Sequence, residues 1–174
     1  MRLFSRRGAT LGVLVVICLS IVHREPVRAQ GVVPGGGGTG TVLTVTGALD
    51  GGPRSFDLEA LRALGLHDLR TATPWTDGRP TFTGPHLADV LRAAGARGSR
   101  IRAKALNAYV IDIPADDAER HGVIVALYQD GQRLTVRTKG PAWLLYPLEL
   151  LRGRNGVVYE MRCVWQLSEL EILD

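Results

Sequence analysis

The stretch VIVALYQDGQRLTV, residues 123–136, decides the fold class of this chain. Two runs of β-forming residues flank Asp130-Gly131, a dipeptide that favours the tight turn of a β-hairpin. The chain on either side of this hairpin is also rich in predicted strands. They cover residues 42–49, 67–73, 80–84, 101–113, 141–147 and 157–173. The segment 101–113 is expected to form two strands that meet near Asn107, and 157–173 is expected to supply the final strands.

Short helices are expected between these strands. Asp57 precedes a helical pattern and can cap it, because its carboxylate accepts from free N–H groups of a first turn. Pro85 is expected in the first turn of a second helix, which Gly95 ends. A third short helix is expected within 114–122. Because strands outnumber helices and few connections are long enough for a βαβ crossover, the sequence predicts an α+β fold with a mixed sheet.

The first 29 residues have the order of a secretory signal peptide. A basic start and an apolar run, residues 8–22, precede a small-residue site that ends at Ala29. The apolar run is short for a membrane span, which needs roughly 17–25 residues, so an uncleaved anchor is the only membrane contact left open. Residues 30–41 are glycine-rich and predict a linker, and 42–174 are expected to form the domain. The protein is therefore expected to be exported, periplasmic or secreted, by the general or the twin-arginine route.

The charge of the chain depends on this leader. Five arginines and one glutamate leave with it, so the formal charge falls from +4 to neutrality, with 16 basic and 16 acidic residues. No nucleic-acid partner is therefore expected. A composition that is 45% hydrophobic and 22% charged indicates a globular domain. The remaining basic cluster is Arg97, Arg100, Arg102 and Lys104, and the last three alternate onto one strand face that is expected to be solvated.

The usual signatures of catalysis are missing from the domain. The glycines of the linker formally contain G-x-G-x-x-G, but no strand precedes them and no helix follows. No serine lies in G-x-S-x-G, and the histidines lack zinc-site spacing. Asp116, Asp117 and Glu119 are expected to be solvated residues at a helix start. Along residues 159–165, alternation places Cys163 on one strand face among large apolar neighbours, where burial would raise its thiol pKa.

The order of several segments resembles a known family. FTGPHLADVL, ALNAYVIDIP, VALYQDGQRL, KGPAWLLYP and VWQLSELEI follow one another as in the sulfite-oxidase-type molybdopterin-binding domain. The resemblance runs from about residue 42 to 172 and is closest to small, exported, stand-alone versions of that domain. It implies the mixed-sheet fold of the family. In catalytic members it also implies a molybdenum–pterin cofactor that oxidises or reduces small oxyanions and sulfoxides.

The residues that would hold this cofactor do not all carry over. Catalytic members have a molybdenum-binding cysteine where this chain has Thr71, Ala72 and Thr73, and a hydroxyl is a poor ligand for such a metal. Where those members have Gly-x-Pro-x-Arg, this chain has Trp143 in place of the arginine. The lysine that often precedes the last tryptophan of the family is absent as well. Cys163 lies in a different segment and is expected to stay away from the pocket.

Together, the resemblance and its departures predict an exported domain that keeps the fold without molybdenum catalysis. An aromatic pocket is expected to bind a small organic ligand or a periplasmic protein. The residues expected at this cofactor or ligand site are Thr71, Thr73, Trp75, Tyr109, Lys139 and Trp143, with Arg79 as a further polar contact. No catalytic or metal-ligating residue is assigned, and molybdopterin is the cofactor that the resemblance implies. Two alternatives stay open: an oxidoreductase that holds molybdopterin without a cysteine bond, and a periplasmic interaction module without a small ligand.

Overall fold

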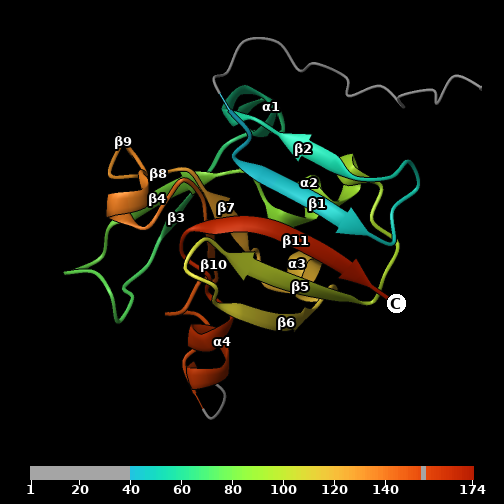
Figure 1. Ribbon diagram of the computed structural model, residues 1–174. Helices are drawn as coiled ribbons and strands as arrows, with labels where there is room; N and C mark the ends of the chain where they lie inside the picture. The colour runs from blue at the N-terminus through green and yellow to red at the C-terminus, as the bar shows by residue number, and fades with distance from the viewer. Residues whose placement is uncertain (1–39, 154–155) are drawn as a thin grey trace, which may run out of the picture. The chain divides into compact units, whose positions relative to one another are not determined.

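The computed structural model describes residues 40–153 and 156–174, which form an α+β fold (Figure 1). This confirms the fold class predicted from the sequence. The expected signal peptide and nearly all of the expected linker lie outside the described residues. Within the described part of the chain, no helix combines the length and the apolar character that crossing a membrane requires.

The first sheet has five strands in the order β2-β1-β11-β5-β6. Their bounds are β1 (Leu43–Gly47), β2 (Arg54–Phe56), β5 (Arg100–Ala105), β6 (Val110–Pro114) and β11 (Leu167–Leu173). β1 is parallel to β11, whereas the other neighbouring pairs are antiparallel. Along β5, Ile101 and Ala103 are buried while their neighbours are partly or fully exposed. This period of two buries one face of the sheet in the core.

The second sheet contains the hairpin and has the order β3-β4-β8-β9. Its strands are β3 (His67–Arg70), β4 (Thr81–Gly84), β8 (Tyr128–Gln129) and β9 (Gln132–Arg133), and β7 (Ile124–Ala126) pairs separately with β10 (Trp143–Leu145). At the turn, Asp130 has a φ of 48° and Gly131 a φ of 75°. Two positive φ values are what a two-residue hairpin turn requires. The predicted hairpin is therefore confirmed.

Four α-helices and one 3-10 helix complete the described residues. They are α1 (Leu58–Ala63), α2 (Leu87–Ala94), α3 (Asp117–Arg120), α4 (Gly156–Arg162) and the 3-10 helix η1 (Val136–Thr138). The Asp57 carboxylate accepts from the N–H of Ala60 at 2.7 Å, as predicted. Gly95 ends α2 in the left-handed conformation. Pro85 was expected in the first turn of α2 but lies just before the helix, because His86 is the N-cap and Leu87 is the first helical residue.

Two predicted strands were wrong in part. β3 ends at Arg70, so residues 71–73 belong to the following loop. Residues 157–162 were expected to be a strand but lie in the helix α4, which Figure 1 shows next to β6. The side chains of Tyr159 and Arg162 turn partly inward on α4 while Val157 and Met161 are exposed. This spacing fits a helical period, and the short sequence alternation was coincidental.

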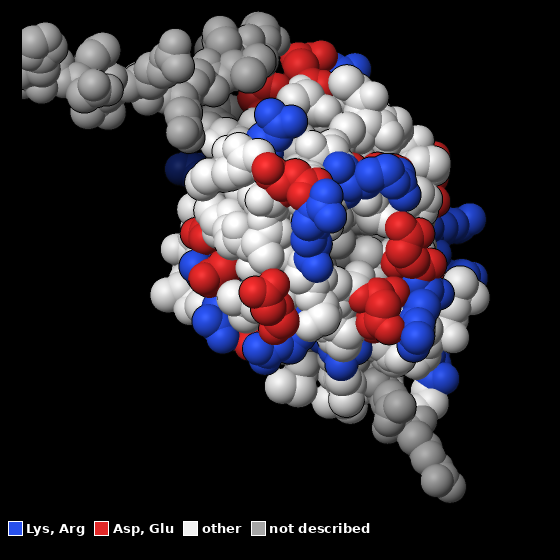
Figure 2. Space-filling model, turned by 90° about the vertical axis from the view of Figure 1, so that its right-hand side faces the viewer, with Lys and Arg blue, Asp and Glu red and all other residues white. Residues whose placement is uncertain are grey.

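The basic cluster of β5 is neutralised by acids on the neighbouring strands. Arg102 is 2.8 Å from Asp112 on β6, and Lys104 is within 3.0 Å of Glu169 and Glu171 on β11. One face of the molecule likewise carries basic and acidic side chains close together (Figure 2). These ion pairs balance the charge of the cluster, and a surface of balanced charge does not attract a polyanion. The structure therefore agrees with the prediction of a solvated face rather than a binding patch.

Candidate functional site

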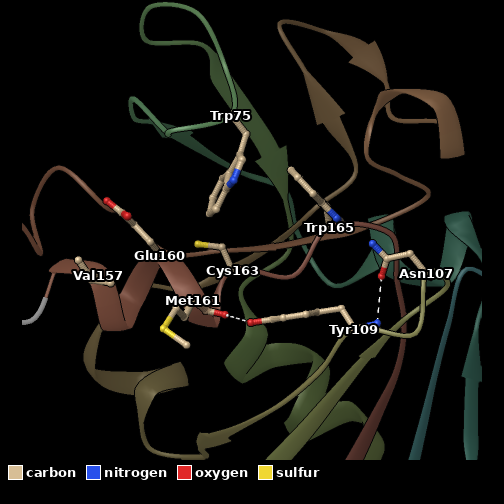
Figure 3. Close-up of a pocket in the computed structure, with 8 residues that line it drawn as sticks. All are labelled: Trp75, Asn107, Tyr109, Val157, Glu160, Met161, Cys163 and Trp165. Carbon is tan, nitrogen blue, oxygen red and sulfur yellow. Dashed lines mark hydrogen bonds between the residues drawn. The ribbon is translucent and has the colours of Figure 1, made fainter.

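A cavity of about 360 Å³ lies where two loops meet α4 and the segment that follows it (Figure 3). The loop between β3 and β4 contributes Trp75, and the β5–β6 turn contributes Tyr109. α4 forms another wall. The cavity is lined by Trp75, Asn107, Tyr109, Val157, Glu160, Met161, Cys163 and Trp165. Its volume lies at the lower end of the range for small-ligand sites.

The loop that carries Trp75 is held by two buried threonines. The Thr73 hydroxyl accepts from the backbone N–H of Trp75 at 3.2 Å and bonds the Thr76 hydroxyl at 2.8 Å. The Thr71 hydroxyl accepts from the N–H of Glu149 at 3.3 Å. Neither threonine lines the aromatic cavity. They were expected at the ligand site, but a short hydroxyl beside a free N–H in a loop bonds the backbone instead.

Tyr109 lies in a tight turn and forms part of the cavity wall. The Asn107 side-chain oxygen accepts from the backbone N–H of Tyr109 at 3.1 Å, which holds the turn. The Tyr109 hydroxyl donates to the backbone carbonyl of Met161 at 2.7 Å, so it bridges the turn to the end of α4. The phenol is therefore oriented at both ends. The structure agrees with the expectation that Tyr109 and Trp75 line a pocket.

A cluster of aromatic rings lies beneath and beside the cavity. The Trp75 and Trp165 ring centroids are 5.6 Å apart in an edge-to-face arrangement, which is favourable for aromatic pairs. Trp143 lies 6.0 Å from Trp75 and 5.2 Å from Phe82. It is fully buried and does not belong to the lining of this cavity, where it was expected. Trp165, which the sequence reasoning did not assign to the site, lines the wall.

The two basic residues expected at the site lie outside the cavity. The Lys139 ammonium is 5.8 Å from the Trp143 ring centroid and 5.7 Å from that of Trp165, a cation–π distance. Lys139 thus touches the aromatic cluster without lining the cavity. Arg79 is paired with Glu149 at 2.8 Å and contributes nothing to the lining.

Cys163 lies in the cavity wall, contrary to the expectation from its position in the sequence. It follows α4 directly, and its thiol donates to the backbone carbonyl of Tyr159, with Sγ 3.4 Å from the oxygen. Burial raises the pKa of Cys163 to about 12. The expected burial of the thiol agrees with the structure. At neutral pH, Cys163 is therefore a thiol and not a thiolate.

The thiol of Cys163 should consequently react slowly in the folded protein. In a chain beginning at residue 30, which has no other cysteine, iodoacetamide at pH 8 should modify native protein at least about a hundredfold more slowly than urea-unfolded protein. Because the folded-state pKa lies above the ordinary value, the unfolded chain loses its proton first, and stability should fall above about pH 9. Mass spectrometry measures the modification. Equal rates in the two states would show an accessible thiolate.

A buried polar cluster lies on the other side of α4 and was missed by the sequence reasoning. Asp117 is only 4% exposed, although it was expected to be a solvated residue. Its carboxylate accepts from the Tyr146 hydroxyl at 2.8 Å and from Arg162 at 2.6 Å, and His121 is 3.6 Å away. Burial and the bond to Asp117 raise the pKa of Tyr146. The cluster joins α3 and α4 to Tyr146, which directly follows β10, and thereby holds α4 beside the cavity.

The remaining acids and histidines do not assemble a metal site in the part of the chain that the structure describes, since no three are grouped suitably. The fold and the site thus define an α+β protein with an aromatic-walled cavity. No protein family and no curated protein matches the sequence of the chain.

Proposed function

We propose that the protein is an exported ligand-binding domain of the sulfite-oxidase-type molybdopterin-binding fold that does not perform molybdenum catalysis. The observation that carries the proposal is the cavity bordered by Trp75, Tyr109 and Trp165. Aromatic walls with few polar groups are typical of sites for small organic molecules. Hydrogen bonds at the Trp75 and Tyr109 positions support a preformed site, which lowers the cost of binding.

The chemistry of the available donors argues against a cysteine-bound molybdenum. The hydroxyls of Thr71 and Thr73 are bonded to neighbouring protein groups. The thiol of Cys163 is buried and already donates to the backbone carbonyl of Tyr159. The indole at Trp143, where the family resemblance implies an arginine, is buried and cannot pair with an anion. These residues do not fit the metal, and we derive no redox step.

A molybdopterin-dependent oxidoreductase without a cysteine bond is the second candidate. Arg137 and Lys139 border a polar hollow of about 620 Å³ beside Trp75. Two basic side chains next to an aromatic ring suit the phosphate and the ring system of a pterin. Near-stoichiometric molybdenum, measured by elemental analysis of protein made with cofactor synthesis intact, would favour this candidate over the first.

A periplasmic interaction module is the third candidate. Val157 is 67% and Met161 is 56% exposed on α4, at the rim of the cavity. Exposed apolar side chains that adjoin a hollow are common where another protein docks. This candidate predicts that small molecules do not bind in the cavity.

The neutral dye N-phenyl-1-naphthylamine tests the first candidate. It fluoresces more strongly in apolar surroundings, and we expect it to bind with a Kd of roughly tens of micromolar. Replacing Trp75 with Ala should weaken binding by about tenfold, because one apolar wall of the cavity is removed. Tyr109→Phe keeps its ring and should weaken binding much less. A fluorescence titration measures each Kd.

Leu150→Ala is the matched control for this titration. Leu150 is exposed and apolar but does not line the cavity, so its loss should leave the Kd unchanged. Absence of dye binding to the wild-type protein would contradict the proposed function and favour the interaction module. Equal losses in Leu150→Ala and Trp75→Ala would show that the dye binds elsewhere.

A further inference from the structure

The charge of the cavity wall restricts the kind of ligand that can enter. Glu160 on α4 is the one lining residue that is charged at neutral pH, since Cys163 is protonated and Asn107 is neutral. No lysine or arginine belongs to the described lining. An anionic ligand would therefore meet a carboxylate without a compensating base. A cation would be attracted to the same carboxylate.

The aromatic rings favour the same sign of charge. Trp75, Tyr109 and Trp165 come from three separate segments and surround the space, with Glu160 and Met161 on the α4 side (Figure 3). The face of an aromatic ring carries negative electrostatic potential, and tryptophan attracts cations most strongly. Several rings around one space form the arrangement by which proteins recognise quaternary and methylated ammonium groups.

Contacts within the protein support this interpretation of the rings. Lys139 already places its ammonium 5.7 Å from the Trp165 ring centroid and 5.8 Å from that of Trp143. The aromatic cluster thus already binds one cation, the Lys139 ammonium, which approaches the rings from outside the cavity. Because Lys139 would repel a second cation at Trp165, the rings of Trp75 and Tyr109 must supply most of the attraction to a ligand.

We propose that the cavity binds an organic cation, with its quaternary or methylated ammonium group between the rings of Trp75 and Tyr109, where the Glu160 carboxylate at the edge of the cavity attracts it. This inference rests on the proposed ligand-binding function and names the class of ligand. The ammonium occupies part of the cavity of about 360 Å³, and the apolar side chains of Val157 and Met161 contact the rest of the molecule.

Two ligands of the same shape, one cationic and one neutral, test whether the cavity prefers a positive charge. Choline and 3,3-dimethylbutan-1-ol differ in that a carbon atom replaces the cationic nitrogen. We expect choline to bind the purified protein roughly tenfold more tightly than the alcohol, as measured by isothermal titration calorimetry. The anion 3,3-dimethylbutanoate should not bind detectably. Equal affinities for choline and the alcohol would overturn the inference.

Two substitutions locate the bound charge. Glu160→Gln should weaken choline binding by roughly fivefold, while leaving N-phenyl-1-naphthylamine binding unchanged. Glu59→Gln is its control, because Glu59 lies on α1 and does not line the cavity. Lys139→Gln should strengthen choline binding. An unchanged choline affinity in Glu160→Gln would contradict the proposed orientation.

The two proposals fail in different ways. If the dye binds but choline does not bind more tightly than the alcohol, the cavity is a site for neutral ligands and the cation inference is wrong. If neither the dye nor choline binds, the proposed function fails together with the inference. Tight binding of the anion would also overturn the inference.

Discussion

Replacing Trp143 with Ala is expected to lower the free energy of unfolding by about 3–5 kcal/mol. The side chain is fully buried and packs against Phe82 and Trp75, with ring centroids 5.2 and 6.0 Å away. Alanine would leave a cavity that the strands around it cannot close, because β10 is paired with β7 on one side. Urea unfolding followed by circular dichroism measures the loss.

Trp75→Ala is the matched control for Trp143→Ala. It removes the same ring from a loop position that is only partly buried, so the loss of stability should be much smaller. The two variants should therefore separate the two roles of tryptophan in this cluster. Trp143→Ala should unfold at lower denaturant, whereas Trp75→Ala should mainly lose binding. Nearly unchanged stability in Trp143→Ala would show that Trp143 is not a core residue.

Replacing Asp117 with Ala is expected to lower the free energy of unfolding by about 3–5 kcal/mol. The substitution leaves the Arg162 guanidinium and the Tyr146 hydroxyl without the carboxylate that pairs with both. Breaking a buried pair in this way costs more than the pair contributes, since an uncompensated charge stays in the interior. Differential scanning calorimetry and urea unfolding measure the effect.

Asp116→Ala controls for the loss of an acid at the start of α3. The side chain of Asp116 is 54% exposed and pairs with Arg120, so its removal should change stability little. Because the Asp117 cluster holds α4, Asp117→Ala should also weaken dye binding at temperatures where the protein is still folded. Equal stabilities of the two variants would contradict the assigned role of Asp117.

Local chemistry explains the parts of the fold that were predictable. A two-residue turn needs positive φ at both positions, and Asp130-Gly131 supplies residues that accept it. Asp57 needs only the N–H groups of the next turn to act as a cap, and Gly95 needs only the left-handed conformation. Each of these preferences is satisfied within a few residues along the chain.

The error at α4 shows where local patterns fail. Residues 157–163 include two valines and a tyrosine, which favour a strand, and a short alternation that favours one as well. Residues 157–162 form a helix in the structure, from which Arg162 reaches Asp117 on α3, and Cys163 directly after the helix lies in the cavity wall. These tertiary contacts decide between two local conformations of similar free energy.

The residues of the candidate site also fall into two groups, those that the sequence predicted and those that only packing places in the cavity. Trp75 and Tyr109 were expected to line an aromatic pocket, and the structure places both in the cavity wall. Trp143 has the same chemistry, but β-sheet pairing buries it. Trp165 and Cys163 are far from Trp75 along the chain, so only the packing of α4 brings them to the same cavity.

By itself, the sequence determined the α+β class, the hairpin, the Asp57 cap of α1 and the Gly95 end of α2, because each depends on residues that are neighbours in the chain. The tertiary structure decided that residues 157–162 form a helix, that Asp117 is buried, and which tryptophans line the cavity. Burial and ring contacts depend on segments up to roughly a hundred residues apart in the chain. The free energy of packing between such segments cannot be predicted from any short stretch of sequence.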